Sequence, residues 1–164
     1  MVIRKIKIED SEKYLSMLKK LDSETKYMMY EPDERCTTLP EIQDCIKSMN
    51  STNSLLLVAE ENSDIVGFLS AERGFANRIK HSAYIVVGIL EDYRGKKIGT
   101  KMFEELERWA ENSGIYRLEL TVMTHNEGAV KLYKNMGFKI EGIKEKSLII
   151  DENFVNEYYM AKTL

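Results

Sequence analysis

The sequence predicts a mixed α/β fold, and three observations carry that prediction. Period-two alternation of apolar residues, typical of strands, occurs at both ends and in the middle of the chain. Amphipathic patterns typical of helices separate these strand patterns. Around residues 90–98, an apolar run passes through a turn rich in glycine and lysine into a helix pattern. A chain of 164 residues with 43% hydrophobic residues can bury a core in one domain.

Seven stretches have the alternation or apolar composition of strands. They are residues 2–8, 54–60, 65–71, 82–90, 116–122, 138–150 and 154–160. The turn at 61–64 and the loop at 151–153 are short enough to make hairpins of the strands that flank them. No repeat, low-complexity tract or linker interrupts the pattern.

Four stretches have the apolar stripe of an amphipathic helix, at about residues 11–21, 40–49, 98–112 and 127–136. Asp10 and Ser11 are candidate caps of the first helix, and Pro40 suits the first turn of the second. Gly114 and Gly137 are placed to end the third and fourth helices. The spine of the third helix is Ile98, Met102, Leu106 and Trp109.

Composition excludes several classes of protein. The net charge of −3 gives no general reason to bind nucleic acid or an anionic membrane. Cys36 and Cys45 are not spaced as metal ligands, so we expect no metal site, and two cysteines are typical of a cytoplasmic protein with free thiols. The alternating N-terminus is unlike a signal peptide, and no apolar run reaches the length of a membrane span.

The turn from Arg94 to Thr100 is the first candidate binding motif. It places two glycines and three cations at the start of a helix, where unpartnered backbone N–H groups and a partial positive charge bind phosphate. Ordinary turn chemistry explains a single such motif almost as well. The dinucleotide pattern GxGxxG and the nucleotide pattern GxxxxGK[ST] are both absent.

The second motif runs from His125 to Phe138. Asn126 can cap a short helix, and Tyr133 lies seven residues further on, on the same face of that helix. A phenol there can stand beside a ligand held by the first motif. Taken alone, Tyr133 is better explained as a half-buried packing residue with its hydroxyl at the surface.

Together these motifs make the chain resemble the GNAT superfamily of acetyl-CoA-dependent N-acetyltransferases over nearly its whole length. Residues 94–99, Arg-Gly-Lys-Lys-Ile-Gly, fit the pyrophosphate pattern Q/R-x-x-G-x-G/A, and Asn126, Leu132-Tyr133 and Gly137-Phe138 fit the second signature. The resemblance implies a single domain over 1–164. It also implies a mostly antiparallel central sheet of about seven strands, splayed between the fourth and fifth and flanked by about four helices.

The resemblance also implies the chemistry and the site. An amine, whether a small amine, an amino acid or a peptide N-terminus, attacks the thioester of acetyl-CoA through a tetrahedral intermediate, and Tyr133 protonates the departing thiolate. The residues implied for acetyl-CoA are Val87, Gly88, Ile89, Arg94, Gly95, Lys96, Lys97, Ile98, Gly99, Thr100 and Asn126. Within this set the strand edge at 87–89 binds pantetheine, and Gly88 lets the ligand approach the backbone.

Lys97 departs from the family pattern, because it occupies the place of the first glycine of the loop. A backbone that needs a positive φ there would strain a lysine. A backbone that needs only an amide donor accepts lysine and gains a cation near phosphate. We expect the second arrangement. Lys96, Lys97 and Lys101 are equally well explained as phosphate ligands or as solvated charges.

The general base stays open. The candidates are Glu119, His125, His81 and Tyr84. Some relatives in the superfamily use a glutamate five residues before the asparagine of the second signature, where this chain has Thr121. A water relay, or an amine that arrives neutral, would need no protein base.

The segment 22–38 is expected to form one wall of the acceptor site. Its apolar residues, Tyr27-Met28-Met29-Tyr30, and its acids, Glu31 and Glu34, suit a cationic amine, although a small satellite core explains them slightly better. Arg35 is expected to pair with an acid. Arg73 and Arg78 are expected either to bind a substrate carboxylate or to be solvated.

Two other functions compete with acetyl transfer. A non-catalytic acyl-CoA-binding or sensor domain would use the same scaffold, but it would not need a leaving-group acid such as Tyr133. A nucleotide-dependent ligase lacks support, because no residue set for metal–nucleotide chemistry is present. The apolar strand 154–160 allows edge pairing or strand exchange, so two copies could form a homodimer.

Overall fold

The computed structural model describes residues 1–164 and contains one seven-stranded sheet in the order β1-β2-β3-β4-β5-β7-β6. The strands are β1 (Val2–Lys5), β2 (Leu55–Glu61), β3 (Asp64–Arg73), β4 (Ser82–Ile89), β5 (Arg117–Met123), β6 (Lys139–Ile150) and β7 (Asn153–Thr163). The helices are α1 (Ser11–Glu24), α2 (Leu39–Ser51), α3 (Ile98–Ser113) and α4 (Glu127–Asn135), with short 3-10 turns at Ile8–Asp10 and Glu91–Tyr93. Neighbouring strands are antiparallel except β4 and β5, which confirms the predicted mixed, mostly antiparallel sheet.

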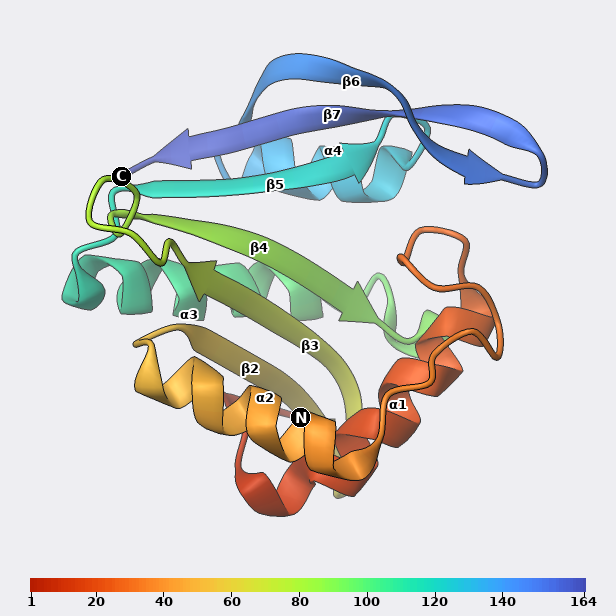
Figure 1. Cartoon of the computed structure of the whole chain (residues 1–164), viewed down its shortest axis with the longest axis vertical. Coiled ribbons are helices and arrows are strands. Elements are labelled where there is room, and N and C mark those ends of the chain that lie inside the picture. Colours follow the sequence, from red (N-terminus) through yellow and green to blue (C-terminus); the bar gives the residue numbers. More distant parts are fainter.

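The helices cover both faces of the sheet (Figure 1). Helices α1 and α2 lie over the β1–β4 half on one face, and α3 and α4 lie on the other. Tyr14 of α1 meets Phe68 of β3 edge to face, with ring centroids 5.7 Å apart. The predicted spine of α3 is buried along its whole length. The main core therefore lies between the helices and the β1–β4 half of the sheet.

Local signals set most helix ends, as predicted. Pro40 lies in the first turn of α2 as predicted. The N–H and the hydroxyl of Thr38 also donate to Glu41 Oε2 at the start of this helix, at 2.7 and 2.8 Å, a contact that is not among the sequence predictions. Gly114 and Gly137 follow α3 and α4 with φ of 66° and 86°, values that glycine adopts without strain. These caps depend on residues only a few positions apart, which explains why the sequence pattern predicts them.

The first strand is shorter than the pattern predicts. β1 ends at Lys5 rather than at residue 8, because the N–H of Lys7 donates to Asp10 Oδ2 and starts a 3-10 turn. Asp10 precedes α1 but its side chain does not cap that helix. Its carboxylate instead pairs with the guanidinium of Arg4, at 2.7 Å. This ion pair lowers the pKa of Asp10.

The tail strand is not an edge strand, so the edge pairing predicted for residues 154–160 is wrong. β7 lies between β5 and β6 and pairs with both. The outer edge at this side of the sheet belongs to β6 (Figure 1). A bulge around residues 145–147 interrupts the register of β6, and such bulges discourage pairing with another chain.

Cys36 and Cys45 are both free and exposed. No helix of the structure combines the length and the apolar composition needed to cross a membrane. No group of three or more histidine, cysteine, aspartate or glutamate side chains is arranged to hold a metal ion.

Gly88 has a packing role that differs from its predicted role. A Cβ at this position would lie 2.4 Å from Leu21 Cδ2 of α1 and 2.8 Å from Phe68 Cε1 of β3. The space on the Cβ side of Gly88 is therefore filled by the core, and the approach of a ligand to its backbone stays a prediction. The missing side chain lets α1 pack closely on β4.

This packing predicts opposite effects for two glycine-to-alanine substitutions. Gly88→Ala should lower the free energy of unfolding by about 1–3 kcal/mol through overpacking. Gly128→Ala is the matched control, because nothing lies within 4 Å of its would-be Cβ, and alanine in a helix should add about 1 kcal/mol. Denaturant unfolding measures both, and a Gly88→Ala variant as stable as the parent would contradict the packing argument.

Candidate active site

The central feature of the site is a splay between β4 and β5. The two strands pair at three positions, Ser82 with Arg117, Ala83 with Leu118 and Tyr84 with Glu119. Beyond Tyr84 the strands diverge (Figure 1), which confirms the predicted splay. The N–H of Leu90 donates to the carbonyl of Val66 on β3. By the alternation of a strand, the backbone groups of Val87 and Ile89 then point away from β3, toward β5.

Arg94 partly closes this open edge. Its Nε donates to the carbonyl of Ile89, at 3.0 Å, from the turn that follows β4. The sequence places Arg94 in the pyrophosphate loop but gives no sign of this contact with the strand. The edge of β4 and the loop after it are therefore joined by a side chain.

The turn before α3 presents unpartnered amides. The N–H groups of residues 95–97 donate to no protein group, and Gly95 has a φ of 73°. The first turn of α3 has neither a side-chain cap nor an acidic residue, so the amides of residues 98–100 are also free of intrahelical partners. Lys96, Lys97 and Lys101 surround this turn and are exposed. The positive end of a 16-residue helix thus faces solvent with cations around it.

Lys97 adopts the conformation that the sequence argument disfavours. Its φ of 62° and ψ of 18° lie in the left-handed region. The expectation that the loop needs only an amide donor there is wrong. The backbone turns as it would for glycine, and the lysine bears a strain of about 1–2 kcal/mol.

Helix α4 docks onto the same end of the sheet. A Cβ on Gly99 would lie 2.7 Å from Leu132 Cδ2 and 3.7 Å from Ile89 Cδ1, so glycine lets α3, α4 and β4 meet. Asn126 caps α4 as predicted, since its Oδ1 accepts from the N–H of Ala129 at 3.3 Å. The side-chain N–H groups of Asn126 make no hydrogen bond. The structure thus brings the two sequence motifs together at the splay.

Tyr133 on α4 is buried between Phe103 and Phe138, with ring centroids 5.7 and 6.1 Å away. Burial raises the pKa of its phenol, and the nearby Tyr84 raises it further. The hydroxyl of Tyr133 makes no hydrogen bond to the protein. Every fully buried side-chain nitrogen or oxygen in the structure has a hydrogen-bond partner, so the Tyr133 oxygen is not fully buried and keeps contact with solvent. Tyr133 is therefore a packing residue, as the alternative interpretation holds, and its hydroxyl remains accessible.

The segment between α1 and α2 reaches across the open end of the splay. The ring of Tyr27 lies 5.5 Å from that of His125, which precedes α4. Lys26 forms an ion pair with Asp151 at the tip of the β6–β7 hairpin. Figure 1 shows this segment beside the arrowhead of β4 and beneath the hairpin. It therefore borders the splay on the face opposite α3 and α4.

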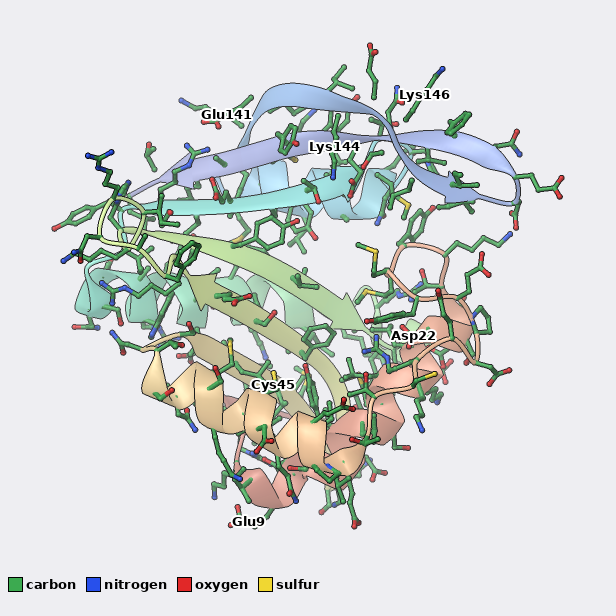
Figure 2. All side chains as sticks on the ribbon, in the orientation of Figure 1. Glu9, Asp22, Cys45, Glu141, Lys144 and Lys146 are labelled. Atoms are coloured by element: carbon green, nitrogen blue, oxygen red, sulfur yellow. The ribbon has the colours of Figure 1, made fainter.

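A buried ion pair anchors this segment to α1. Arg35 Nε donates to Asp22 Oδ2 at 2.5 Å, and the Asp22 side chain is only 2% exposed. Asp22, labelled in Figure 2, lies on α1 near the end of β4. The predicted pairing of Arg35 with an acid is confirmed. Met28 packs against the main core rather than a satellite core, while Met29 is 73% exposed.

Arg73 has a structural role that the sequence did not predict. Its guanidinium donates to the carbonyls of Lys80 and Ser113, at 2.7 and 3.1 Å. It is thus neither solvated nor free for a substrate carboxylate. Arg78 is exposed and makes no side-chain hydrogen bond, in line with the solvated alternative.

The candidate bases lie in different places. His81 precedes the paired end of β4, about 20 Å along the strand from Val87, so it does not line the splay. Glu119 accepts from Arg117 Nε at 2.8 Å, and Arg117 also binds Glu141. The hydroxyl of Tyr84 lies 2.8 Å from Thr121 Oγ1, across the splay.

The sequence patterns do not predict the pocket that lies beside Tyr84. A pocket of about 330 Å³ is lined by Tyr84, Arg117, Glu119, Leu120, Glu141, Tyr159 and Met160. Figure 2 labels Glu141 on β6, at the outer side of the sheet. Strand alternation places Glu119 on a solvent face of the sheet. Glu141 and Tyr159 come to lie beside Glu119 only because β7 pairs with β5 and β6 pairs with β7. No local signal predicts that pairing.

Comparison with known proteins identifies the family of the chain. The profile of the acetyltransferase (GNAT) family matches residues 15–138, and the chain belongs to that family. It is 36% identical over 112 residues to the L-amino acid N-acetyltransferase AaaT of Escherichia coli, an alignment that covers 65% of this chain and 66% of that protein. The chain thus spans slightly less than two thirds of this relative.

Two solved structures have the same fold. The GNAT-family acetyltransferase of Streptococcus pneumoniae superposes with a TM-score of 0.94 at 30% identity, covering 99% of this chain and 98% of that one. The yncA protein of Salmonella typhimurium, solved with its cofactor acetyl-CoA, superposes with a TM-score of 0.89 at 16% identity, covering 100% and 94%. At that identity the second likeness shows the fold alone.

The left-handed backbone at Lys97 predicts a stabilising substitution. Lys97→Gly should raise the free energy of unfolding by about 1 kcal/mol, because glycine adopts this conformation without a Cβ clash. Lys96→Gly is the matched control, since Lys96 has no positive φ, and added backbone freedom should lower stability by up to about 1 kcal/mol. Denaturant midpoints measure both, and equal destabilisation by the two substitutions would refute the strain at Lys97.

Proposed function

We propose that this chain is an N-acetyltransferase that moves an acetyl group from acetyl-CoA to a primary amine, with residues 1–164 as its acetyltransferase domain. The acceptor is a small amine, an amino acid or a peptide N-terminus. One observation carries the proposal. The free backbone edge of β4 lies between the unpartnered amides of residues 95–100 and the accessible phenol of Tyr133. The names of the relatives, and acetyl-CoA in the Salmonella typhimurium structure, support the same conclusion.

The site residues fit an elongated, anionic acyl donor. The amides and lysines of the 94–101 turn suit a pyrophosphate, because the helix end is positive and carries no acid of its own. The edge of Val87 and Ile89 offers strand-like partners to the amide groups of pantetheine. The free N–H groups of Asn126 can donate to the same arm. Acetyl-CoA, when bound, supplies the acetyl thioester.

The chemistry follows from the groups around the splay. A backbone N–H on the free edge of β4 polarises the thioester carbonyl and stabilises the oxyanion that forms as the amine attacks. Tyr133 then gives its proton to the departing thiolate. Burial raises the pKa of Tyr133, so the phenol carries its proton at neutral pH. The same desolvation raises the proton affinity of a thiolate that leaves beside it.

Replacing the hydroxyl of Tyr133 tests this role. Tyr133→Phe keeps the buried ring, so coenzyme A affinity by calorimetry should stay nearly unchanged, while kcat falls by about 10²–10⁴-fold. Tyr116→Phe is the control, because Tyr116 is 65% exposed at the start of β5 and should retain full activity. Thiol release with a panel of amino acids, polyamines and short peptides measures turnover and identifies the acceptor class.

Three results would count against the proposal, each in a different way. Absence of any heat of binding with coenzyme A would overturn the assignment of the donor site. Binding without turnover for every amine would favour the non-catalytic acyl-CoA-binding domain. Full activity of Tyr133→Phe would remove the proton-donor role and leave acetyl transfer in place.

A further inference from the structure

Two tyrosine hydroxyls flank the root of the splay from opposite faces of the sheet. Tyr133 comes from α4 on one face. Tyr84 is the last residue of β4 paired with β5, and its side chain lies on the face of Glu119 and Thr121. Tyr84 is near enough to Tyr133 to raise the pKa of its phenol. A group that enters the splay from the face opposite α3 and α4 therefore meets Tyr84 before it meets Tyr133.

Tyr84 is joined to Thr121 across the gap between the strands. Its hydroxyl lies 2.8 Å from Thr121 Oγ1, and either oxygen can be the donor. When Tyr84 donates to Thr121, its own lone pairs stay free to accept from a third group. Tyr84 is 42% exposed, so that third group can be an incoming molecule.

Most other polar groups of this face are already committed, while the phenol of Tyr159, which lines the pocket beside Tyr84, makes no hydrogen bond. Glu119 accepts from Arg117 at 2.8 Å, and Arg117 also binds Glu141. The ring of His125 lies against Tyr27 at the open end of the splay rather than at its root. Tyr84 and Thr121 are thus the two hydroxyl groups that contact each other at the point where the strands part.

Resting on the proposed function, we propose that Tyr84 and Thr121 form a hydroxyl relay that removes the proton from the acceptor amine. The amine nitrogen bonds to the thioester carbon, and its extra proton passes to the Tyr84 oxygen. The Tyr84 proton moves to Thr121 Oγ1 in the same event, and the Thr121 proton moves to water. The C–S bond then breaks, the thiolate takes a proton from Tyr133, and Tyr133 regains a proton from water in place of the one that the relay released. The products are the acetamide and the free thiol, with no change of oxidation state.

The relay explains how a site can work without a carboxylate at position 121. A neutral hydroxyl is a weak base, so the Tyr84 oxygen can accept a proton only if it passes on its own proton at the same time. Thr121 is partly exposed, so its proton can pass to solvent, and a pocket of about 330 Å³ lies beside Tyr84. The carboxylates of Glu119 and Glu141 line that pocket and favour a positive charge within it.

Removal of each hydroxyl tests the relay. Tyr84→Phe and Thr121→Val keep the size of each side chain, and each should lower kcat, by about 10²-fold for Tyr84→Phe. Thr121→Ser should restore most of the activity, because it restores the hydroxyl. The double variant should be no slower than Tyr84→Phe alone, because the two groups act as one unit. Coenzyme A affinity and denaturant midpoints should match the parent in all four proteins.

Chemical rescue separates a proton relay from a packing role. Rising concentrations of imidazole buffer should restore part of the kcat of Tyr84→Phe, because an external base replaces the missing relay, and should leave Tyr116→Phe unaffected. Wild-type kcat in both Tyr84→Phe and Thr121→Val would overturn the relay and leave the proposed acetyltransferase intact. Loss of activity without any rescue by imidazole would also overturn it. A parent protein that transfers no acetyl group would overturn the function and the relay together.

Discussion

The loss of pairing between β4 and β5 after Tyr84 is the constraint on which the rest of the site depends. Up to that residue the strands are joined as an ordinary parallel pair. Beyond it, the backbone groups of Val87 and Ile89 lack a strand partner, and backbone groups need partners when they are removed from water. Arg94 satisfies the carbonyl of Ile89. The remaining groups suit a ligand that can pair like a strand, and an elongated chain of amides does so.

Helix α3 places its positively charged N-terminal end beside the gap between β4 and β5. Gly99 lets the first turn of α3 approach both Leu132 and Ile89, so the positive end of a long helix stands beside the open edge. The turn before it contains a lysine held in the left-handed region. Such strain persists only where surrounding structure over-determines the backbone. Here it accompanies a run of amides without protein partners, as in an anion-binding turn.

The two faces of the splay differ in composition, and they are built from different parts of the chain. The α3 and α4 face is built from two continuous motifs and ends in a buried phenol. The opposite face combines β4, β5, the β6–β7 hairpin and the segment after α1, which Arg35 and Asp22 fasten in place. Its ion pairs and hydroxyl contacts join residues far apart in the chain. A donor bound from one face and an amine arriving from the other would meet between Tyr84 and Tyr133.

Local chemistry made much of this protein predictable. The helix caps at Asn126 and Gly114 and the turn at residues 94–100 depend on residues within one or two turns of each other, so their patterns can be detected in the chain. The features that escaped prediction depend on register. The interior place of β7, the partners of Arg73 and the contact of Tyr84 with Thr121 all follow from which strands lie side by side. Period-two alternation tells which face a side chain occupies but not which neighbour it meets, because it does not specify the order of strands in a sheet. The positive φ of Lys97 escaped for a related reason, since the packing around the turn and not the residue itself selects that backbone conformation.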